Sequence, residues 1–411
     1  MKKVAVIGAG VSGLSISHFL KAKYEVTTYE KEEMPGGLIR CKRVNNCLFH
    51  ICGGHVFNSK REDVLEWFWS FFDKNKEFVK SERNSVIYIK KGTIVPYPIE
   101  NHVYLLDKDV QLSFISDLFK INHGSKTPPN DFDTFLRETF GNTLYELYFK
   151  PYNQKIWQRN LKKIPISWLD GKLPMPSVKD MIYNNMNHVK EKTFVHSTFW
   201  YEKYNGSQYI ADKLAHNINI RYNTEINSIE YKNHKWRIND EIYDIVIYCG
   251  NIKQMVSAIK GINIETYSKA IELLEYHGTT SVFCEIDKNP FSWIYLPNLS
   301  YDSHRIICTA NFAQSNCSNG IFTATIEFTD RIEKDAILNN LKLMPYRPKY
   351  ITHHYNKYTY PIQNRDTREM ISSLKKELER YNFYFTGRFA DWEYYNMDTA
   401  IGAAMDLAKN I

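Results

Sequence analysis

A glycine-rich turn near the start of the chain, between a short apolar segment and a helix-like segment, most constrains the fold. Residues 4–7 (Val-Ala-Val-Ile) are apolar and β-prone, and Gly8-Ala-Gly10-Val-Ser12-Gly13 follows at once. In this fingerprint the first glycine makes the turn and the second lets a pyrophosphate reach the N–H groups of the helix N-terminus. The third lets the helix pack closely on the strand. The pattern predicts a dinucleotide-binding unit.

A second strand supports the same interpretation. Residues 24–29 are β-prone and lead into Glu30, 20 positions after Gly10, where a carboxylate can accept hydrogen bonds from ribose hydroxyls. A glycine-rich turn alone is weak evidence because it can be a tight structural connection, but here strand, helix and acid occur in the expected order. The later segment Gly36-Gly37-Leu38-Ile39-Arg40 resembles flavoproteins of the glutathione-reductase and amine-oxidase superfamily, which favours FAD over NAD.

Length and composition narrow the class of protein. With 411 residues, 43% of them hydrophobic, the chain indicates two or three domains. The start lacks a signal-like segment and no apolar run is long enough to cross a bilayer, so we expect no transmembrane segment and a cytoplasmic location. Seven cysteines without a Cys-x-x-Cys pair predict buried free thiols, and no metal site is expected. The net charge of +7 is spread along the chain, which does not favour nucleic acid as a partner but suits an anionic ligand.

Further along, the pattern predicts an α/β fold whose nucleotide domain is discontinuous. Residues 99–165 are helix-like and interrupt it, whereas residues 217–250 return to strands and end in Gly250. Residues 277–330 are strand-rich. A strand, Gly387-Arg388 and a small-residue helix at 399–408 close the chain, and form a second place where N–H groups can meet a flavin or a phosphate.

Three candidate site segments each have a structural alternative. His55 follows Gly53-Gly54; a lone histidine is more often structural, but beside a flavin we expect this loop to face the ring. The aromatic and amide residues of 148–157 are compatible with core packing or with binding. Arg305 begins an apolar strand, which is usually a solvated end but beside a cofactor would clamp an anion.

Taken together, the motifs resemble the UDP-galactopyranose mutase family, flavoenzymes that interconvert the six- and five-membered ring forms of a nucleotide-bound galactose. The resemblance rests on motifs that run from end to end: Gly8-x-Gly10-x-x-Gly13, Gly53-Gly54-His55-Val-Phe, Pro96-Tyr-Pro98-Ile, Pro151-Tyr152-x-x-Lys155-x-Trp157, Arg305, Tyr360-Pro361 and Gly387-Arg388-Phe-x-x-Trp392-x-Tyr394-x-x-Met397-Asp398. The C-terminal motif is the most specific, and outside the motifs the chain diverges.

The resemblance implies three structural units. The first is a Rossmann-type FAD-binding domain, discontinuous over 1–75, 207–265 and 360–411. The second is an inserted helical domain at 99–170. The third is a twisted antiparallel β-sheet domain formed by 76–98, 171–206 and 266–359.

The resemblance also implies roles for individual residues. The expected FAD-binding residues are Gly8, Gly10, Ser12, Gly13, Glu30, Gly37, Leu38, Arg40, Gly54, His55, Gly387, Arg388, Met397 and Asp398. The expected substrate-binding residues are Tyr152, Asn153, Trp157, Lys172, Arg305, Tyr360 and Tyr394, with Tyr152 stacking on uracil and Arg305 and Tyr394 holding the diphosphate. His55, Lys172 and Arg305 are the expected catalytic residues.

In the chemistry that the resemblance implies, N5 of reduced FAD attacks the anomeric carbon as the nucleotide diphosphate leaves, which gives a covalent flavin–sugar adduct. The sugar then opens and recloses through a different hydroxyl without net redox change. The expected partners are a UDP-hexose, NAD(P)H as reductant and a possible second copy of the chain. Lys172 stands where the family usually has a catalytic arginine and lacks its bidentate fork, so an N-acetylated or deoxy hexose remains open as the sugar.

Two alternatives remain open. An amine-oxidase-like oxidoreductase or desaturase shares the first motif and the Gly36–Arg40 segment, but lacks support at the C-terminus. A non-catalytic flavin- or nucleotide-binding module rests only on Lys172.

Overall fold

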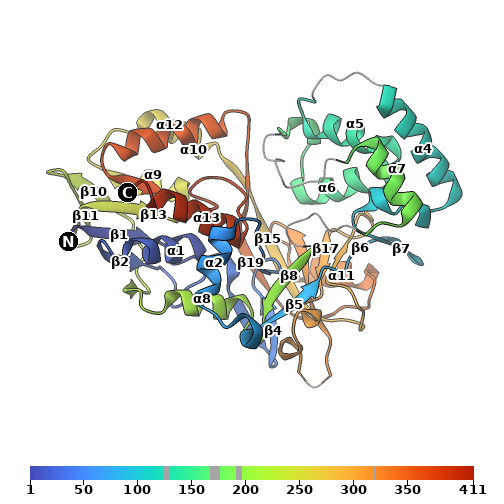
Figure 1. Ribbon diagram of the computed structural model, residues 1–411, viewed down its shortest axis with the longest axis horizontal. Coiled ribbons are helices and arrows are strands. Elements are labelled where there is room, and N and C mark those ends of the chain that lie inside the picture. Colours follow the sequence, from blue (N-terminus) through green and yellow to red (C-terminus); the bar gives the residue numbers. More distant parts are fainter. Residues whose placement is uncertain (124–128, 167–175, 191–196, 319) are drawn as a thin grey trace.

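The structure is a computed structural model that describes residues 1–123, 129–166, 176–190, 197–318 and 320–411. Figure 1 shows three regions: a layered α/β region that contains both termini, a group of helices on the opposite side, and a large sheet that runs between and below them. Within the described residues, no helix combines the length and the apolarity that a membrane crossing requires. All seven cysteines are free, and five of them are buried.

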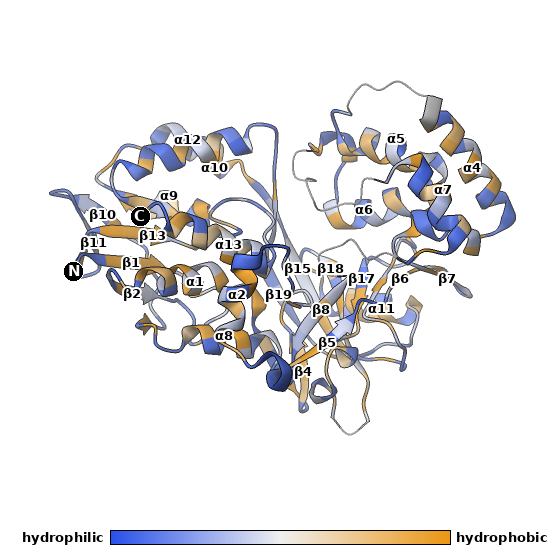
Figure 2. Cartoon of the chain, viewed as in Figure 1, coloured by the Kyte–Doolittle hydropathy of each residue, from blue (hydrophilic) through white to orange (hydrophobic). Residues whose placement is uncertain are grey.

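A five-stranded parallel sheet forms the centre of the α/β region, in the order β20-β13-β1-β2-β9. Its strands are β1 (Lys3–Ile7), β2 (Glu25–Tyr29), β9 (Ile220–Arg221), β13 (Ile245–Tyr248) and β20 (Phe383–Phe385). The central strands β1 and β13 are buried on both faces and therefore almost wholly apolar, as Figure 2 shows. Strands from the start, middle and end of the chain thus lie side by side, and the Rossmann-type fold predicted from the sequence is confirmed.

Helices cover both faces of this sheet (Figure 1). They are α1 (Val11–Leu20), α2 (Glu62–Trp69), α8 (Ser207–Ala215), α9 (Ile252–Ala258), α10 (Glu265–Glu272), α12 (Thr367–Glu379) and α13 (Met397–Ala408), with the short α3 (Lys74–Glu77) beyond α2. A small four-stranded sheet lies beside them, made of β10 (Ile229–Lys232), β11 (Lys235–Ile238), β12 (Glu241–Tyr243) and β14 (Ile259–Lys260). The C-terminal helix α13 packs along α1, so the last residues of the chain complete the layer that begins at the glycine turn.

The large sheet has seven strands in the order β19-β15-β18-β17-β16-β6-β7. They are β6 (Ser85–Lys90), β7 (Thr93–Pro96), β15 (Glu275–Glu285), β16 (Trp293–Tyr295), β17 (Arg305–Ile307), β18 (Thr323–Thr329) and β19 (Lys349–Ile362). The expectation of an antiparallel sheet needs one correction, because β16 pairs with β6 in parallel. More than two hundred residues separate these two strands along the chain, which leaves ample length for the crossover that a parallel pair requires.

The helical region consists of α4 (Lys108–His123), α5 (Phe132–Leu144), α6 (Lys150–Trp157) and α7 (Val178–Asn187), with a π-helical turn at Tyr145–Phe149 before α6. Its core is continuous with side chains of the large sheet, including Ile87, Trp293 and Tyr295. Helix α7 lies in a stretch expected to belong to the sheet domain, but Asn185 Nδ2 on α7 donates to Glu100 O (2.7 Å) and so holds it on the helical region. The division into domains by residue number stays a prediction.

Two short antiparallel strand pairs flank the segment that carries His55. Strands β3 (Cys41–Val44) and β4 (Cys47–His50) lead into the loop that carries His55, and β5 (Phe78–Glu82) pairs with β8 (Thr198–Glu202). Phe57, just after that loop, bridges to Trp200 in β8. The loop is therefore held at both ends by strands.

Candidate active site

The three glycines of the first turn differ in what surrounds them. Gly8 has a φ of 104°, in the left-handed region that favours glycine. A Cβ on Gly13 would lie 1.8 Å from the carbonyl oxygen of Gly8, so only glycine allows the helix to pack this close. A Cβ on Gly10 would meet no atom within 4 Å, which means that the space in front of this residue is open. Gly8 therefore makes the turn, Gly13 allows the close packing of the helix, and Gly10 leaves space for a ligand.

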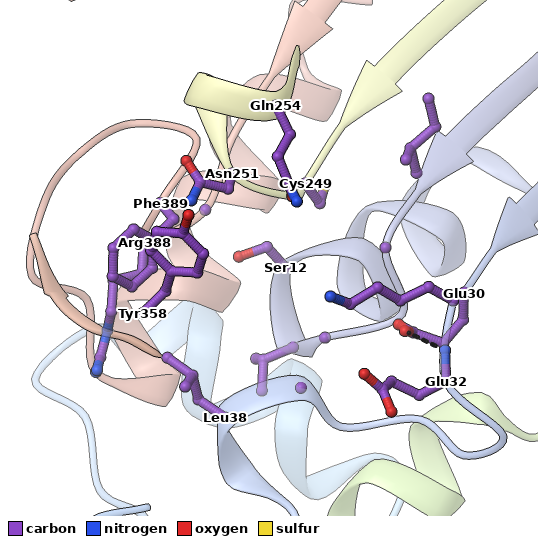
Figure 3. Close-up of a pocket in the computed structure, with 18 of the residues that line it drawn as sticks. Ser12, Glu30, Glu32, Leu38, Cys249, Asn251, Gln254, Tyr358, Arg388 and Phe389 are labelled. Carbon is purple, nitrogen blue, oxygen red and sulfur yellow. Dashed lines mark hydrogen bonds between the residues drawn. The ribbon is translucent and has the colours of Figure 1, made fainter. Parts of the chain in front are cut away.

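The open space belongs to a cavity of about 980 Å³ at the carboxyl ends of β1, β2 and β13, which we call the nucleotide cavity (Figure 3). The expected cofactor residues that line it are Gly8, Gly10, Ser12, Glu30, Gly37, Leu38, Arg40, His55, Gly387, Arg388 and Met397. Three others lie outside the lining: Gly13 beneath the turn, Gly54 against Ile307 of β17, and Asp398 behind Met397 in the first turn of α13. Figure 3 shows Glu30 at one end of the cavity, Asn251 and Arg388 at the other, and Ser12 between them.

Glu30 is oriented by the backbone. Its carboxylate accepts hydrogen bonds from Ala9 N (2.7 Å) and Glu32 N (3.1 Å), and the residue is 7% exposed. A carboxylate has about four lone-pair positions, so two bonds leave acceptor capacity for ligand hydroxyls. The geometry is compatible with the ribose contact that the sequence predicts.

His55 presents an orphaned nitrogen. Its Nε2 is buried and has no hydrogen-bond partner among the described residues. Burial, together with the nearby Arg388 cation, lowers the pKa of His55 to about 4, so the imidazole is neutral at neutral pH. A neutral, unpartnered ring nitrogen in the lining of a cavity fits a polar ligand atom that completes its hydrogen bonding.

Asn251 is a cavity residue that the motifs did not reveal. It caps α9, where Oδ1 accepts from Lys253 N (3.0 Å), while its buried Nδ2 has no partner in the described part of the chain. It is only 7% exposed and lines the nucleotide cavity. Because ligands of open α/β sheets bind at the carboxyl ends of the strands, its position just after β13 could have identified it. With His55, Asn251 gives the cavity two unsatisfied polar groups, which supports the fit of a dinucleotide.

A second cluster surrounds Arg305 at the start of β17. Arg305 Nε donates to Glu327 Oε2, and Arg305 Nη2 donates to Tyr360 OH (2.9 Å). Burial alone would raise the pKa of Glu327, but Arg305 and His304 hold it well below its usual range. Burial likewise opposes the charge on Arg305, but Glu327 outweighs it and raises the pKa of Arg305 well above the ordinary value. Arg305 is therefore a permanent cation.

The cluster connects to the nucleotide cavity through two tyrosines. The ring of Tyr360 stacks on that of Tyr394, with centroids 5.7 Å apart and planes at 4°. Arg388, which lines the cavity, lies over the Tyr394 ring at 4.5 Å and is fixed by the carbonyl of Tyr395, to which its Nε donates (2.9 Å). We call Arg305, Tyr360, Tyr394 and Arg388 the arginine–tyrosine row. The row brings together residues from β17, β19 and the C-terminal motif.

Glu327 also joins this row to the His55 loop. Its second oxygen, Oε1, accepts from Gly53 N at 2.8 Å, two residues before His55. The side chain is wholly buried, so both oxygens of the carboxylate are used within the protein. One carboxylate thus positions Arg305 and the loop that lines the cavity.

Helix α6 presents the remaining expected residues. The Tyr152 ring stacks on Tyr148 and meets the edge of Tyr295, the strand partner of Arg305. Trp157 Nε1 donates to Asn153 Oδ1 (3.3 Å), so these two side chains are held together. Lys172, the remaining expected catalytic residue, lies outside the described residues.

Comparisons with known proteins concern the chain and its fold as a whole. A family described as an NAD(P)-binding Rossmann-like domain matches residues 6–74. The UDP-galactopyranose mutase of Mycoplasma genitalium is 22% identical, over 99% of this chain and 94% of that protein. The dTDP-fucopyranose mutase of Escherichia coli is 28% identical, over 41% of this chain and 45% of that protein.

Among solved structures, a crystal structure of reduced UDP-galactopyranose mutase superimposes with a TM-score of 0.88 at 20% identity, and the match covers 100% of this chain and 95% of that one. The comparisons confirm the fold class, the resemblance to pyranose mutases and the expectation of an isomerase-type enzyme. They also support a flavin as the cofactor.

Proposed function

We propose that the chain interconverts the pyranose and furanose forms of a nucleotide-diphosphate sugar, UDP-galactose or a related hexose, with the help of a flavin. The observation that carries the proposal is the arginine–tyrosine row, which joins a partly buried permanent cation to the nucleotide cavity. Such a row suits a ligand whose diphosphate lies at Arg305 and whose sugar faces the cofactor.

Reduced FAD is the proposed cofactor, with NAD(P)H as its reductant. When bound, it supplies a nucleophilic N5 that can displace a nucleotide diphosphate from the anomeric carbon of a sugar. Residues of the chain form the proposed FAD site. Gly10 leaves room for the pyrophosphate, Glu30 accepts hydrogen bonds from ribose hydroxyls, and His55 and Arg388 offer polar groups to the flavin ring. Asn251 Nδ2 adds one donor to this set.

Arg305 is the proposed catalytic cation. Departure of a nucleotide diphosphate places negative charge on the leaving oxygens, and a fixed cation in a water-poor site stabilises that charge without reorganisation. Glu327 and Tyr360 hold the guanidinium in place before any ligand arrives. Tyr394, stacked between Tyr360 and Arg388, supplies a hydroxyl for the same diphosphate in this proposal.

Tyr152, Asn153 and Trp157 form the proposed base site. The support is their common position on α6: the Tyr152 ring lies against Tyr295 of β16 and against His304, the residue before Arg305, and Trp157 donates to Asn153. An aromatic face beside an amide suits a uracil, which stacks through its ring and hydrogen-bonds through its edge. The proposed role of Lys172 and the proposed homodimer stay predictions.

The test is an assay of the holoenzyme, fully reduced with dithionite, on UDP-, dTDP- and GDP-hexoses. We expect ring isomerisation of at least one of these sugars, with product forming steadily and without stoichiometric use of reductant. Absence of isomerisation with all of them would overturn the proposal. Transfer of two electrons from a substrate to oxidised flavin would instead favour the oxidase or desaturase alternative.

A further inference from the structure

Lys155 ties helix α6 to the connection between β16 and β17. Its Nζ donates to three backbone carbonyls of that connection: Leu296 O (2.8 Å), Asn298 O (2.5 Å) and Ser303 O (2.9 Å). The residue is 9% exposed, and the Tyr301 ring lies 4.6 Å from the ammonium. An ammonium has three donors and no acceptor, so all of its hydrogen-bonding capacity is used inside the protein.

The connection between β16 and β17 is short and ends directly before Arg305, the proposed catalytic cation. Leu296 N donates to His304 O at 2.9 Å, which closes the loop, and Arg305 follows His304 directly. The loop carbonyls converge on one buried point, where the donors of Lys155 Nζ satisfy them even though burial lowers the pKa of Lys155 to about 7. The shape of the loop, and with it the start of β17, therefore depends on Lys155.

At the other end of the link, α6 presents Tyr152 one turn before Lys155. The Tyr152 ring contacts His304 (6.4 Å between centroids) and Tyr295 (5.5 Å), so it lies beside the strands that Lys155 holds. The C-terminus of α6 is anchored separately: His277 Nε2 donates to Trp157 O (2.7 Å), and Arg159 pairs with Glu275 (2.9 Å). These outer anchors bind the helix to β15, whereas Lys155 binds it to the loop before Arg305.

We propose that Lys155 is a positioning residue that fixes the spacing between the base site on α6 and the diphosphate site at Arg305, so that the cleft prefers a ligand that spans both. The inference rests on the proposed function, because it concerns the nucleoside diphosphate part of that substrate. Lys155 does not contact the ligand: its effect passes through Tyr152 on one side and Arg305 on the other. Removal of Lys155 should weaken the binding of a nucleoside diphosphate more than the binding of a nucleoside or of pyrophosphate alone.

The experiment compares wild type, Lys155→Met and Lys155→Gln as FAD-loaded holoenzymes. Lys150→Met is the control, because Lys150 lies on the same helix, is partly exposed, and contacts Glu146 (2.8 Å) and the Tyr145 ring (5.9 Å) but not the loop before Arg305. The dissociation constants of UDP, uridine and pyrophosphate are measured by titration, with flavin content and circular dichroism recorded for each variant. Two sites held at the right spacing gain affinity for a ligand that links them, and displacement by about 1 Å can forfeit that gain.

We expect Lys155→Met to raise the dissociation constant of UDP by about tenfold or more, while the dissociation constants of uridine and pyrophosphate each stay within about twofold of wild type. Lys155→Gln, with two donors instead of three, should have a UDP dissociation constant between those of wild type and Lys155→Met. Lys150→Met should bind UDP as wild type does. Turnover should show a raised KM and, because Arg305 is also the proposed catalytic cation, a lowered kcat.

Several results would overturn the inference. One is equal weakening of all three ligands, since that indicates a merely structural role. Another is UDP binding to Lys155→Met that equals wild type. If Lys155→Met loses FAD or fails to fold, Lys155→Gln decides by the same criteria. A wild type that binds no UDP would overturn the inference, whereas the proposed function fails only if no nucleotide-bound hexose is isomerised. A wild type that binds UDP and isomerises a UDP-hexose would leave only the role of Lys155 in question.

Discussion

Replacing Arg305 by Met should destabilise the protein far more than the loss of one surface charge. Glu327 is wholly buried and Arg305 is 18% exposed, so the substitution leaves an uncompensated carboxylate in the interior. Breaking a buried pair in this way costs about 3–5 kcal/mol of unfolding free energy. Because Arg305 keeps some exposure, we expect about 3 kcal/mol, at the lower end of that range. Glu327→Gln should cost a similar amount, since it leaves the guanidinium without its counterion.

The double variant Arg305→Met/Glu327→Gln separates the charge effect from the other contacts. It removes both charges, so the main penalty disappears, while the weakened bonds to Gly53 N and Tyr360 OH remain as costs. We expect a total loss of about 2–3 kcal/mol, compared with about 6 kcal/mol for the sum of the single variants. The difference is the coupling between the two side chains.

Urea denaturation of the four holoproteins, followed by tryptophan fluorescence, measures these values. Arg347→Met is the matched control: Arg347 pairs with Asp287 at 2.7 Å but is 85% exposed, and it should change stability by less than about 1 kcal/mol. If the single variants add to within about 0.5 kcal/mol of the double variant, Arg305 and Glu327 are not coupled, and the account of the buried pair is wrong.

Three further predictions concern the cofactor and base sites. Gly10→Ala should fold like wild type but retain FAD about tenfold less well, because its Cβ enters open space that a pyrophosphate needs. Gly13→Ala, by contrast, should fail to fold. FAD retention in Gly10→Ala equal to that of wild type would count against the proposed pyrophosphate site at Gly10. Tyr152→Ala should raise the UDP dissociation constant about tenfold and leave the flavin spectrum unchanged, and unaltered UDP affinity would remove the base-site assignment. Since burial lowers the pKa of His55 to about 4, the unfolded chain takes up its proton near pH 6.5 and the folded chain only near pH 4, so stability should fall as the pH drops between these values. His55→Phe should make that fall shallower in urea titrations, and an unchanged slope would contradict the buried neutral imidazole.

Local sequence patterns predict the nucleotide region well, because the constraint there is local. The strand, the glycine turn and the acid Glu30 lie within 30 residues, and each has a backbone reason for its position. Apolar runs that end in glycine also predict that β1, β13 and β20 belong to one domain, although which of them pair is seen only in the structure. The parallel β16–β6 pair could not be anticipated, since register across distant strands depends on packing rather than on local pattern.

The residues that connect the two sites were the hardest to anticipate. Glu327 and Lys155 act on the site through other residues: one bonds Gly53 N and Arg305, the other three loop carbonyls. Neither partnership leaves a spacing signature, because the backbone partners lie more than a hundred residues away and Arg305, 22 residues from Glu327, meets it only through the pairing of β17 with β18. Lys155 occurs in a recognisable motif, but only the structure shows that it donates to the carbonyls of the loop before Arg305. Asn251 differs, because its place after β13 was open to prediction.

The order in which the strands of the central sheet occur along the chain has a consequence for how the protein is made. Strand β20 completes one edge of that sheet, and Gly387, Arg388 and Met397 supply one wall of the nucleotide cavity. The cavity can therefore close only after residue 397 has left the ribosome, while the helical region, whose helices are contiguous, can begin to fold earlier. Cofactor capture then follows synthesis of residue 397, and cells short of flavin should accumulate protein with exposed apolar sheet edges, a form prone to degradation and aggregation.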